Sequence, residues 1–228
     1  MDPRAYERQE LLRQMIRARR AEERRVGEPV IGNEAVVAGI AHGIGPQDTV
    51  VEGGGVPLAI GLGVSTALEG PPLVTVFVLD ADSGSAQELR EALELAAHWR
   101  LPVLFCRENN LHPLGGLASE TGFAAEHGIP AWSVDGMDVL AVAEAIDEAV
   151  EAIRGGEGPY LLELSTCRFR GRAEVAHWRE FDPVRLLADR MRAEDAFTDA
   201  DLTRLLSEVD ADLEAEVAAG VATFEPAR

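Results

Sequence analysis

Apolar residues recur at helical spacing at both ends of the chain. Near the start they are separated by arginines and glutamates, which predicts an amphipathic helix with one face toward a core. Its apolar positions are Leu11, Leu12, Met15 and Ile16. Asn33 is a good N-cap and predicts a second, short helix over 34–41. The same amphipathic pattern returns near the end and predicts helices over 183–191 and 198–218.

Between these ends, β-branched and aromatic runs alternate with segments of helical period. The predicted strands are 49–51, 73–79, 102–106, 131–134 and 160–165. The predicted helices are 56–68, 87–99, 118–127 and 138–153. Strands that alternate with helices across short connections predict an α/β fold with a mainly parallel, doubly wound sheet. The domain organisation that we expect is an N-terminal helical extension over 1–30, an α/β domain over 31–172 and a C-terminal helical extension over 173–228.

The charge of the chain narrows the classes of partner. The sequence has 21 basic and 40 acidic residues, a formal net charge of −19. A nucleic-acid backbone or an anionic membrane would repel such a chain, so neither is expected as a partner. The first 25 residues are charged and lack an apolar signal-peptide core, and no apolar stretch is long enough for a bilayer. We therefore expect a cytoplasmic protein.

Ligands of parallel α/β sheets bind at the carboxyl ends of the strands. The predicted loops there are 52–55, 80–85, 108–116, 135–137 and 166–172. Two carry oxygen donors, because 80–85 reads Asp-Ala-Asp-Ser-Gly-Ser and 108–110 reads Glu-Asn-Asn. Such donors suit a magnesium or calcium ion with a diphosphate, but the same residues are also ordinary helix caps and turn formers. Spacing alone leaves both interpretations open.

Several motifs occur in an order that is typical of one family. They are Gly-Asn-Glu-Ala-Val at 32–36, Gly-Pro-Gln-Asp at 45–48, Trp-Arg-Leu-Pro-Val at 99–103, Glu-Asn-Asn at 108–110, Val-Asp-Gly-Met-Asp-Val at 134–139, Arg-Phe-Arg-Gly at 168–171 and Asp-Pro at 182–183. In this order the chain resembles the α subunit of the thiamine-diphosphate-dependent E1 component of 2-oxo acid dehydrogenases, of the pyruvate and branched-chain type. The resemblance covers nearly the whole chain. It implies the thiamine-diphosphate-binding fold.

The resemblance also implies a cofactor site for thiamine diphosphate and Mg²⁺. The cofactor-binding positions that it implies are Gly54, Gly55, Val56, Asp82, Ser83, Gly84, Ser85, Asn110 and Arg168. The metal ligands would be Asp82, Asn110 and the backbone carbonyl of His112. The histidine of the family's active-site loop would fall on Arg172, which is then the candidate catalytic position.

Three departures from the family pattern bear on that site. The family's Gly-Asp-Gly segment is Asp-Ala-Asp at 80–82, so that Ala81 stands where a metal-binding aspartate is expected. Asp80 and Asp82 add negative charge where glycines let the backbone approach phosphates. The family also carries an insert with a Tyr-Arg pair before the glycines at 53–55, and this chain lacks it.

Two functions follow from these observations. The first is an E1 α-like subunit that acts with an E1 β-like partner, in an α2β2 assembly, in the oxidative decarboxylation of a 2-oxo acid. A lipoyl-bearing E2 is a further partner implied by the resemblance. The second is a catalytically degenerate homologue, a structural or regulatory subunit that has lost the cofactor. Ala81, the two aspartates and the missing insert favour the second, and the family's activity favours the first.

Overall fold

The structure, a computed structural model, describes residues 3–25, 29–53, 55–70, 73–79, 85–112, 118–170, 179–194 and 197–219. Contacts divide the chain into two compact units. The first unit takes its residues from 1–42, 136–142 and 167–225, and the second takes its residues from 43–135 and 143–166. The three consecutive parts expected from the sequence do not coincide with these two units. The division into three parts stays a prediction.

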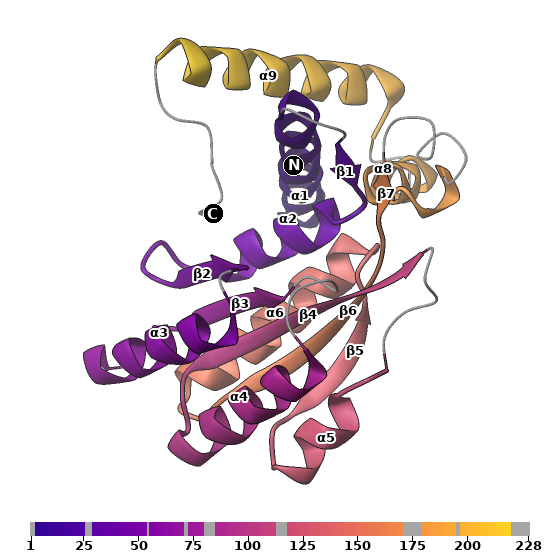
Figure 1. Ribbon diagram of the computed structural model, residues 1–228. Helices are drawn as coiled ribbons and strands as arrows, with labels where there is room; N and C mark the ends of the chain where they lie inside the picture. Colours follow the sequence, from indigo (N-terminus) through magenta and orange to yellow (C-terminus); the bar gives the residue numbers. More distant parts are fainter. Residues whose placement is uncertain are drawn as a thin grey trace. The chain divides into compact units, whose positions relative to one another are not determined.

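The second unit is built on a five-stranded sheet with the order β2-β3-β4-β6-β5 (Figure 1). Its strands are β2 (Thr49–Glu52), β3 (Thr75–Leu79), β4 (Val103–His112), β5 (Ala131–Asp135) and β6 (Tyr160–Cys167). The pairs β2–β3, β3–β4 and β5–β6 are parallel. This confirms the mainly parallel α/β sheet that the alternation of strands and helices predicts.

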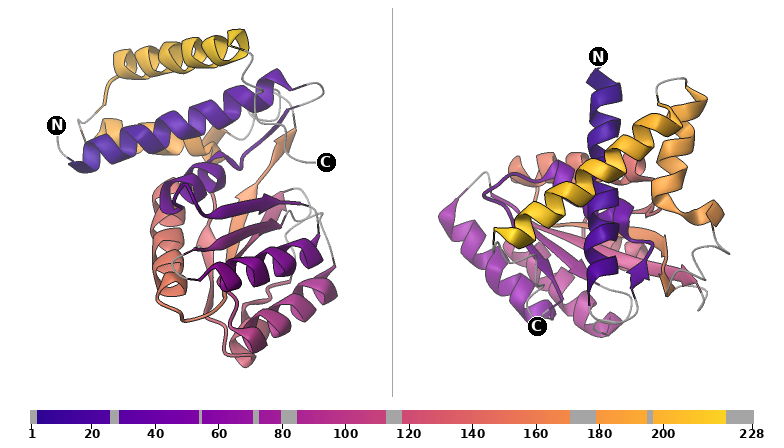
Figure 2. Two further views of the ribbon diagram at one scale, coloured as in Figure 1. Left: turned by 90° about the vertical axis from the view of Figure 1, so that its left-hand side faces the viewer. Right: turned by 90° about the horizontal axis from the view of Figure 1, so that it is seen from above.

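Helices cover both faces of this sheet (Figure 2). α3 (Val56–Glu69) and α4 (Ala86–Trp99) lie on one face, and α6 (Val139–Arg154) lies on the other. Under α3 and α4 the core is apolar, and Phe77 and Phe105 meet edge to face with ring centroids 6.3 Å apart. The doubly wound arrangement is thereby confirmed.

The first unit is mainly helical. It contains α1 (Pro3–Arg24), α2 (Glu34–Gly43), the 3-10 helix η1 (Arg179–Phe181), α8 (Pro183–Ala193) and α9 (Asp199–Ala218). The four apolar positions of the first predicted helix are buried in α1, which packs on α8 and α9. Among the described residues, none of these or the other helices combines the length and the apolarity that a membrane crossing needs.

A short antiparallel pair in the first unit was not predicted. β1 (Val30–Ile31) pairs with β7 (Phe169–Arg170), and two-residue strands leave no periodic signal in a sequence. Gly32 makes this pairing possible, because a Cβ there would lie 2.0 Å from the carbonyl oxygen of Cys167 and its φ is 117°.

Four predicted loops are wrong at their starts. Glu52 ends β2 and does not open the loop after it. Residues 108–112 continue β4, Asp135 ends β5, and Thr166 and Cys167 end β6. In β4 and β6 the strand runs further than its apolar core because the buried polar residues Glu108, Asn109 and Thr166 continue it, whereas Asp135 at the end of β5 is exposed. The predicted helix over 118–127 is also shorter, since α5 spans Thr121–Glu126 and residues 118–120 bind side chains of the sheet instead.

Candidate functional site

The carboxyl ends of β2, β3 and β4 form one edge of the second unit. Parallel pairing places Glu52 beside Val78 and Leu79 beside Arg107, so β2 and β3 end at nearly the same level. β4 does not end there, because residues 108–112 extend beyond the last residue of β3. This extension carries the Glu-Asn-Asn motif past the edge, where ligands of parallel sheets bind.

The start of α3 lies at this edge because α3 follows β2 directly. Gly55 is its N-cap residue, with a φ of 84° that favours glycine, and Val56 is buried behind it. The described residues supply no side-chain cap to this helix. Backbone N–H groups that lack such a cap carry partial positive charge at a helix start, which suits a phosphate group.

The start of α4 is already capped by its own side chains. The hydroxyl of Ser85 accepts a hydrogen bond from the backbone N–H of Glu88 at 3.2 Å. The backbone N–H of Ser85 donates to Oε2 of Glu88 at 2.8 Å. This capping box fixes the first turn of α4 and occupies the N–H of Ser85. A role of Ser85 in cofactor binding stays a prediction.

The end of β4 supplies the hard donors. Asn110 is partly buried and precedes the end of the strand at His112, whereas the carboxylate of Glu108 is buried. An amide oxygen, a backbone carbonyl and a helix start are donors that fit a diphosphate and a hard cation. In the parts that the structure describes, no cluster of three His, Cys, Asp or Glu residues could hold a metal ion. Asp82, the third metal ligand that the family resemblance implies, lies outside the described residues.

The predicted site residues fall into three groups. Gly55, Val56, Ser85, Asn110 and the backbone of His112 belong to the carboxyl edge of the second unit. Arg168, between β6 and β7, is a partly buried residue of the first unit. The remaining predictions lie outside the described residues, and these are Gly54, Asp82, Ser83, Gly84 and Arg172.

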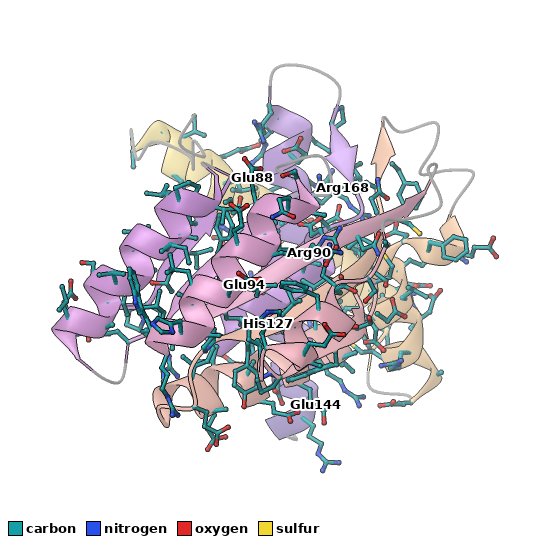
Figure 3. All side chains as sticks on the ribbon, turned by 60° about the horizontal axis from the view of Figure 1, so that its bottom comes forward. Glu88, Arg90, Glu94, His127, Glu144 and Arg168 are labelled. Atoms are coloured by element: carbon teal, nitrogen blue, oxygen red, sulfur yellow. The ribbon has the colours of Figure 1, made fainter. Side chains whose placement is uncertain are left out.

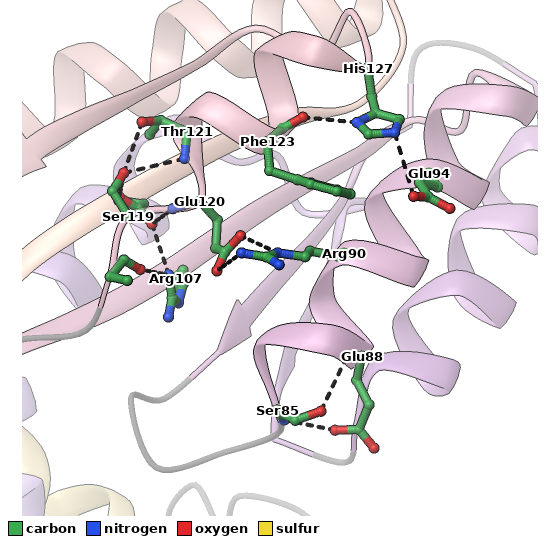
Figure 4. A network of polar contacts seen from close by, with 12 residues as sticks. Ser85, Glu88, Arg90, Glu94, Arg107, Ser119, Glu120, Thr121, Phe123 and His127 are labelled. Carbon is green, nitrogen blue, oxygen red and sulfur yellow. Dashed lines mark hydrogen bonds and ion pairs between the residues drawn. The ribbon is translucent and has the colours of Figure 1, made fainter.

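A buried ion pair beside this edge was not predicted from the sequence (Figure 4). Arg107 of β4 and Glu163 of β6 pair at 2.9 Å, with side-chain exposures of 8% and 2%. The Ser119 hydroxyl donates to Glu163 Oε2 at 2.6 Å, and the Glu120 N–H donates to its Oε1 at 2.8 Å. Arg107 also donates to the Ala118 carbonyl at 2.9 Å. Glu163, a single charged residue in the otherwise apolar run 160–164, was the signal for a buried charge that needs a partner, but it does not identify Arg107.

Further polar contacts connect the segment around this ion pair to α4 and α5. Arg90 of α4 holds the buried carboxylate of Glu120 through two hydrogen bonds of 2.7 and 3.2 Å. These hydrogen bonds, together with the charge of the carboxylate, raise the pKa of Arg90. The guanidinium also lies 5.2 Å from the ring centroid of Phe123. Figure 3 shows Arg90 and Glu94 on α4 beside His127, whose ring is 3.4 Å from the Glu94 carboxylate.

The thiol in β4 is not a reactive group of the site. Cys106 is fully buried, and burial raises its pKa, with the neighbouring carboxylate of Glu108 adding to the shift. A thiol with a raised pKa stays protonated and is a poor nucleophile. Cys106 therefore acts as a small core residue.

Comparisons with known proteins identify the family. The model of the dehydrogenase E1 component family matches residues 52–227. The pyruvate dehydrogenase E1 component subunit alpha of Rhizobium meliloti (strain 1021) is 37% identical over 153 residues, which are 63% of this chain and 43% of the relative. The testis-specific mitochondrial form from Homo sapiens is 32% identical over 188 residues, which are 75% of this chain and 48% of the relative.

A crystal structure from Mycobacterium smegmatis, assigned as a thiamin diphosphate-dependent enzyme, aligns with a TM-score of 0.46 and 18% identity. The alignment covers 58% of this chain and 31% of that one. The chain spans about half the length of the curated relatives that it matches. The family match covers most of the sequence, including the whole sheet beyond β2. The chain belongs to the dehydrogenase E1 component family.

Proposed function

We propose that this chain is an E1 α-like subunit that acts with an E1 β-like partner in the oxidative decarboxylation of a 2-oxo acid. The relatives with 32–37% identity are named as α subunits of pyruvate dehydrogenase, which supports this class of reaction. An α2β2 assembly in the cytoplasm, with a lipoyl-bearing E2 as a further partner, completes the proposal.

The extension of β4 is the observation that carries this proposal. It brings Asn110 and the backbone carbonyl of His112 beyond the end of β3. At the same edge, α3 starts without a side-chain cap from any described residue. In the proposed site Asn110, the His112 carbonyl and Asp82 hold Mg²⁺, while Gly55 and Val56 present backbone to the diphosphate. The roles of Arg168 and Arg172 that the family resemblance implies stay predictions.

The division of labour in the site follows from the donors that the chain possesses. Thiamine diphosphate, when bound, would supply the carbanion stabilisation that decarboxylation of a 2-oxo acid requires. The chain's own residues bind the charged end of the cofactor and fix its position. The β-like partner would complete the site, because the described part of this chain contributes only diphosphate and metal donors.

A second candidate is the catalytically degenerate subunit, and one sequence observation favours it. Ala81 has no oxygen with which to bind a metal, and Asp80 and Asp82 bring negative charge to the place of a diphosphate. These three residues lie outside the described part of the chain. The two candidates differ in whether the assembly turns over a 2-oxo acid.

The test is turnover by the reconstituted assembly. The chain is produced together with its β-like partner and assayed for decarboxylation of pyruvate and of branched-chain 2-oxo acids, with thiamine diphosphate and Mg²⁺. We expect activity in the wild type and at least about a tenfold loss in Asn110→Ala, since a metal ligand is removed. An inactive wild-type assembly would favour the degenerate subunit.

The matched control is Asp48→Asn. Asp48 lies before β2, at the opposite edge of the sheet, and its 2%-exposed side chain pairs with Arg154 and accepts the Val74 N–H at 2.9 Å. Its loss destabilises the same unit without touching the carboxyl edge. Full activity in Asn110→Ala, or equal losses in both variants, would refute the proposed site.

A further inference from the structure

Glu163 is a buried carboxylate of the second unit that accepts three hydrogen bonds. It accepts hydrogen bonds from the Arg107 guanidinium, the Ser119 hydroxyl and the Glu120 backbone N–H, at 2.6 to 2.9 Å. Only 2% of its side chain is exposed. A charge buried to this degree is retained only where partners satisfy it, and here the partners come from β4 and from residues 118–120.

The partners of this pair flank the end of β4 in sequence. Arg107 is the last residue of β4 that lies beside β3, and residues 108–112 continue directly from it. Residues 118–120 follow that extension along the chain, and each of the three is bound to Arg107 or Glu163. The chain is thus fixed to the same ion pair immediately before and shortly after the residues that carry Asn110 and the carbonyl of His112.

A second contact, from α4, holds residues 118–120 on the side that faces away from the ion pair. Glu120 is 1% exposed and is bound at both carboxylate oxygens by Arg90 of α4. Residues 118–120 are therefore held between the sheet and α4, and α5 begins directly after them (Figure 4). In this arrangement, residues 118–120 cannot shift far without breaking a buried hydrogen bond.

We propose that Glu163, through Arg107, is a positioning residue that fixes the cofactor-binding end of β4. It touches neither cofactor nor substrate. Its carboxylate holds both flanks of the segment that contains Asn110, so that the Asn110 amide and the His112 carbonyl keep one spacing. The consequence for cofactor affinity rests on the proposed function, whereas the fixing of the strand end does not.

The experiment compares Glu163→Gln with Asp48→Asn. The first substitution keeps the shape of the side chain but removes the charge that Arg107 requires, whereas the second neutralises an equally buried carboxylate at the amino edge. Amide hydrogen exchange is followed by mass spectrometry on peptides that cover 103–112, 118–126 and 75–79. Affinity for thiamine diphosphate with Mg²⁺ is measured by calorimetry on the same preparations, assembled with the β-like partner.

We expect faster exchange at 103–112 and 118–126 in Glu163→Gln, with 75–79 unchanged. Cofactor affinity falls by about 10- to 100-fold in this variant, as is typical when a residue supporting a metal ligand is lost. In Asp48→Asn, we expect a similar loss in melting temperature and no change in affinity. A purely structural role would give equal affinity in both variants. Wild-type exchange at 103–112 in Glu163→Gln would overturn the proposal.

Two further comparisons distinguish a folding failure and a failure of the proposed function from a failure of this proposal. If Glu163→Gln does not fold, Ser119→Ala removes one hydrogen bond from the carboxylate and leaves the ion pair, and we expect the same changes at smaller size. Unchanged exchange in that variant would count against the proposal. If the wild-type assembly binds no cofactor, the proposed function fails, and the exchange data alone then decide whether Glu163 fixes the strand end.

Discussion

Arg19 is the central charge of the first unit. Its guanidinium donates to Glu34 at 2.9 Å and to both oxygens of Asp182 at 2.7 and 2.9 Å. Burial alone would lower the pKa of Arg19, but the two carboxylates outweigh burial and raise it. Glu34 also accepts the Gly32 N–H, and Asp182 caps α8, so one cation joins α1, α2 and α8.

We predict that Arg19→Met lowers the free energy of unfolding by about 3 kcal/mol, because it leaves the carboxylate of Glu34 buried without a cation. Urea unfolding at neutral pH measures the change. The control is Arg25→Met, whose pair with Glu22 is largely solvent-exposed and should cost less than about 1 kcal/mol. Equal costs in the two variants would contradict the central role of Arg19.

From the raised pKa of Tyr160 we predict that the free energy of unfolding falls at high pH. Burial of the phenol, followed by its 2.8 Å hydrogen bond to Glu157, raises the pKa of Tyr160 from 10.0 to about 12. The folded protein thus holds the phenolic proton where the unfolded chain has released it. Stability from this group is full below pH 10 and is lost as the pH rises toward 12. The free energy of unfolding, measured across this range, should fall more steeply in the wild type than in Tyr160→Phe.

At the scale of elements, the structure separates what periodicity can predict from what it cannot. Apolar period located the helices and strands, because burial of apolar faces dominates their stability. It failed for β4, where the polar run from Glu108 to Asn110 predicted a loop but continues the strand. Arg107, directly before this run, is held by Glu163 of β6 and by the carbonyl of Ala118, and no local pattern reveals partners so far away in the sequence.

α9 packs on α1 through an apolar stripe and a set of ion pairs. Leu205, Val209 and Leu213 are buried at intervals of four residues, while Arg17 of α1 pairs with Glu216 at 2.6 Å in an exposed position. We predict that Leu213→Ala lowers the free energy of unfolding by about 2 kcal/mol, because a cavity replaces a buried side chain. Arg17→Ala should cost less than about 1 kcal/mol.

Urea unfolding at low and high salt measures both contributions to this packing. At about 1 M salt, the screening length shrinks to roughly 3 Å, and the cost of Arg17→Ala should vanish while that of Leu213→Ala remains. A larger cost for the arginine variant would show that the ion pairs, rather than the apolar stripe, hold α9 on α1.

At the scale of the whole molecule, the sequence was enough to predict the family and the edge of the sheet at which a ligand is expected. It did not predict the contacts of Glu163 beside that edge. The motif order pointed to the dehydrogenase E1 component family, which the family match confirms. The carboxyl edge followed from the parallel sheet, and it holds Gly55, Val56, Ser85 and Asn110. The support by Glu163 depends on contacts between distant segments, which spacing along the chain does not encode.

The structure shows where some of the charged residues behind the net charge of −19 are paired. Many acidic residues of α9 face arginines of α1, among them Glu208 with Arg13 and Glu216 with Arg17. These charges are neutralised within the first unit. Because the net charge of −19 already subtracts all 21 basic residues, these ion pairs do not reduce the acidic excess of the chain; they show where part of its charge is paired.

The most direct test of the proposed site is a calorimetric titration of thiamine diphosphate, with Mg²⁺ present, into the chain assembled with its β-like partner. We expect saturable binding to the wild type and at least about a tenfold weaker affinity for Asn110→Ala. The absence of binding heat with the wild-type assembly, or an unchanged affinity in the variant, would contradict the proposed site.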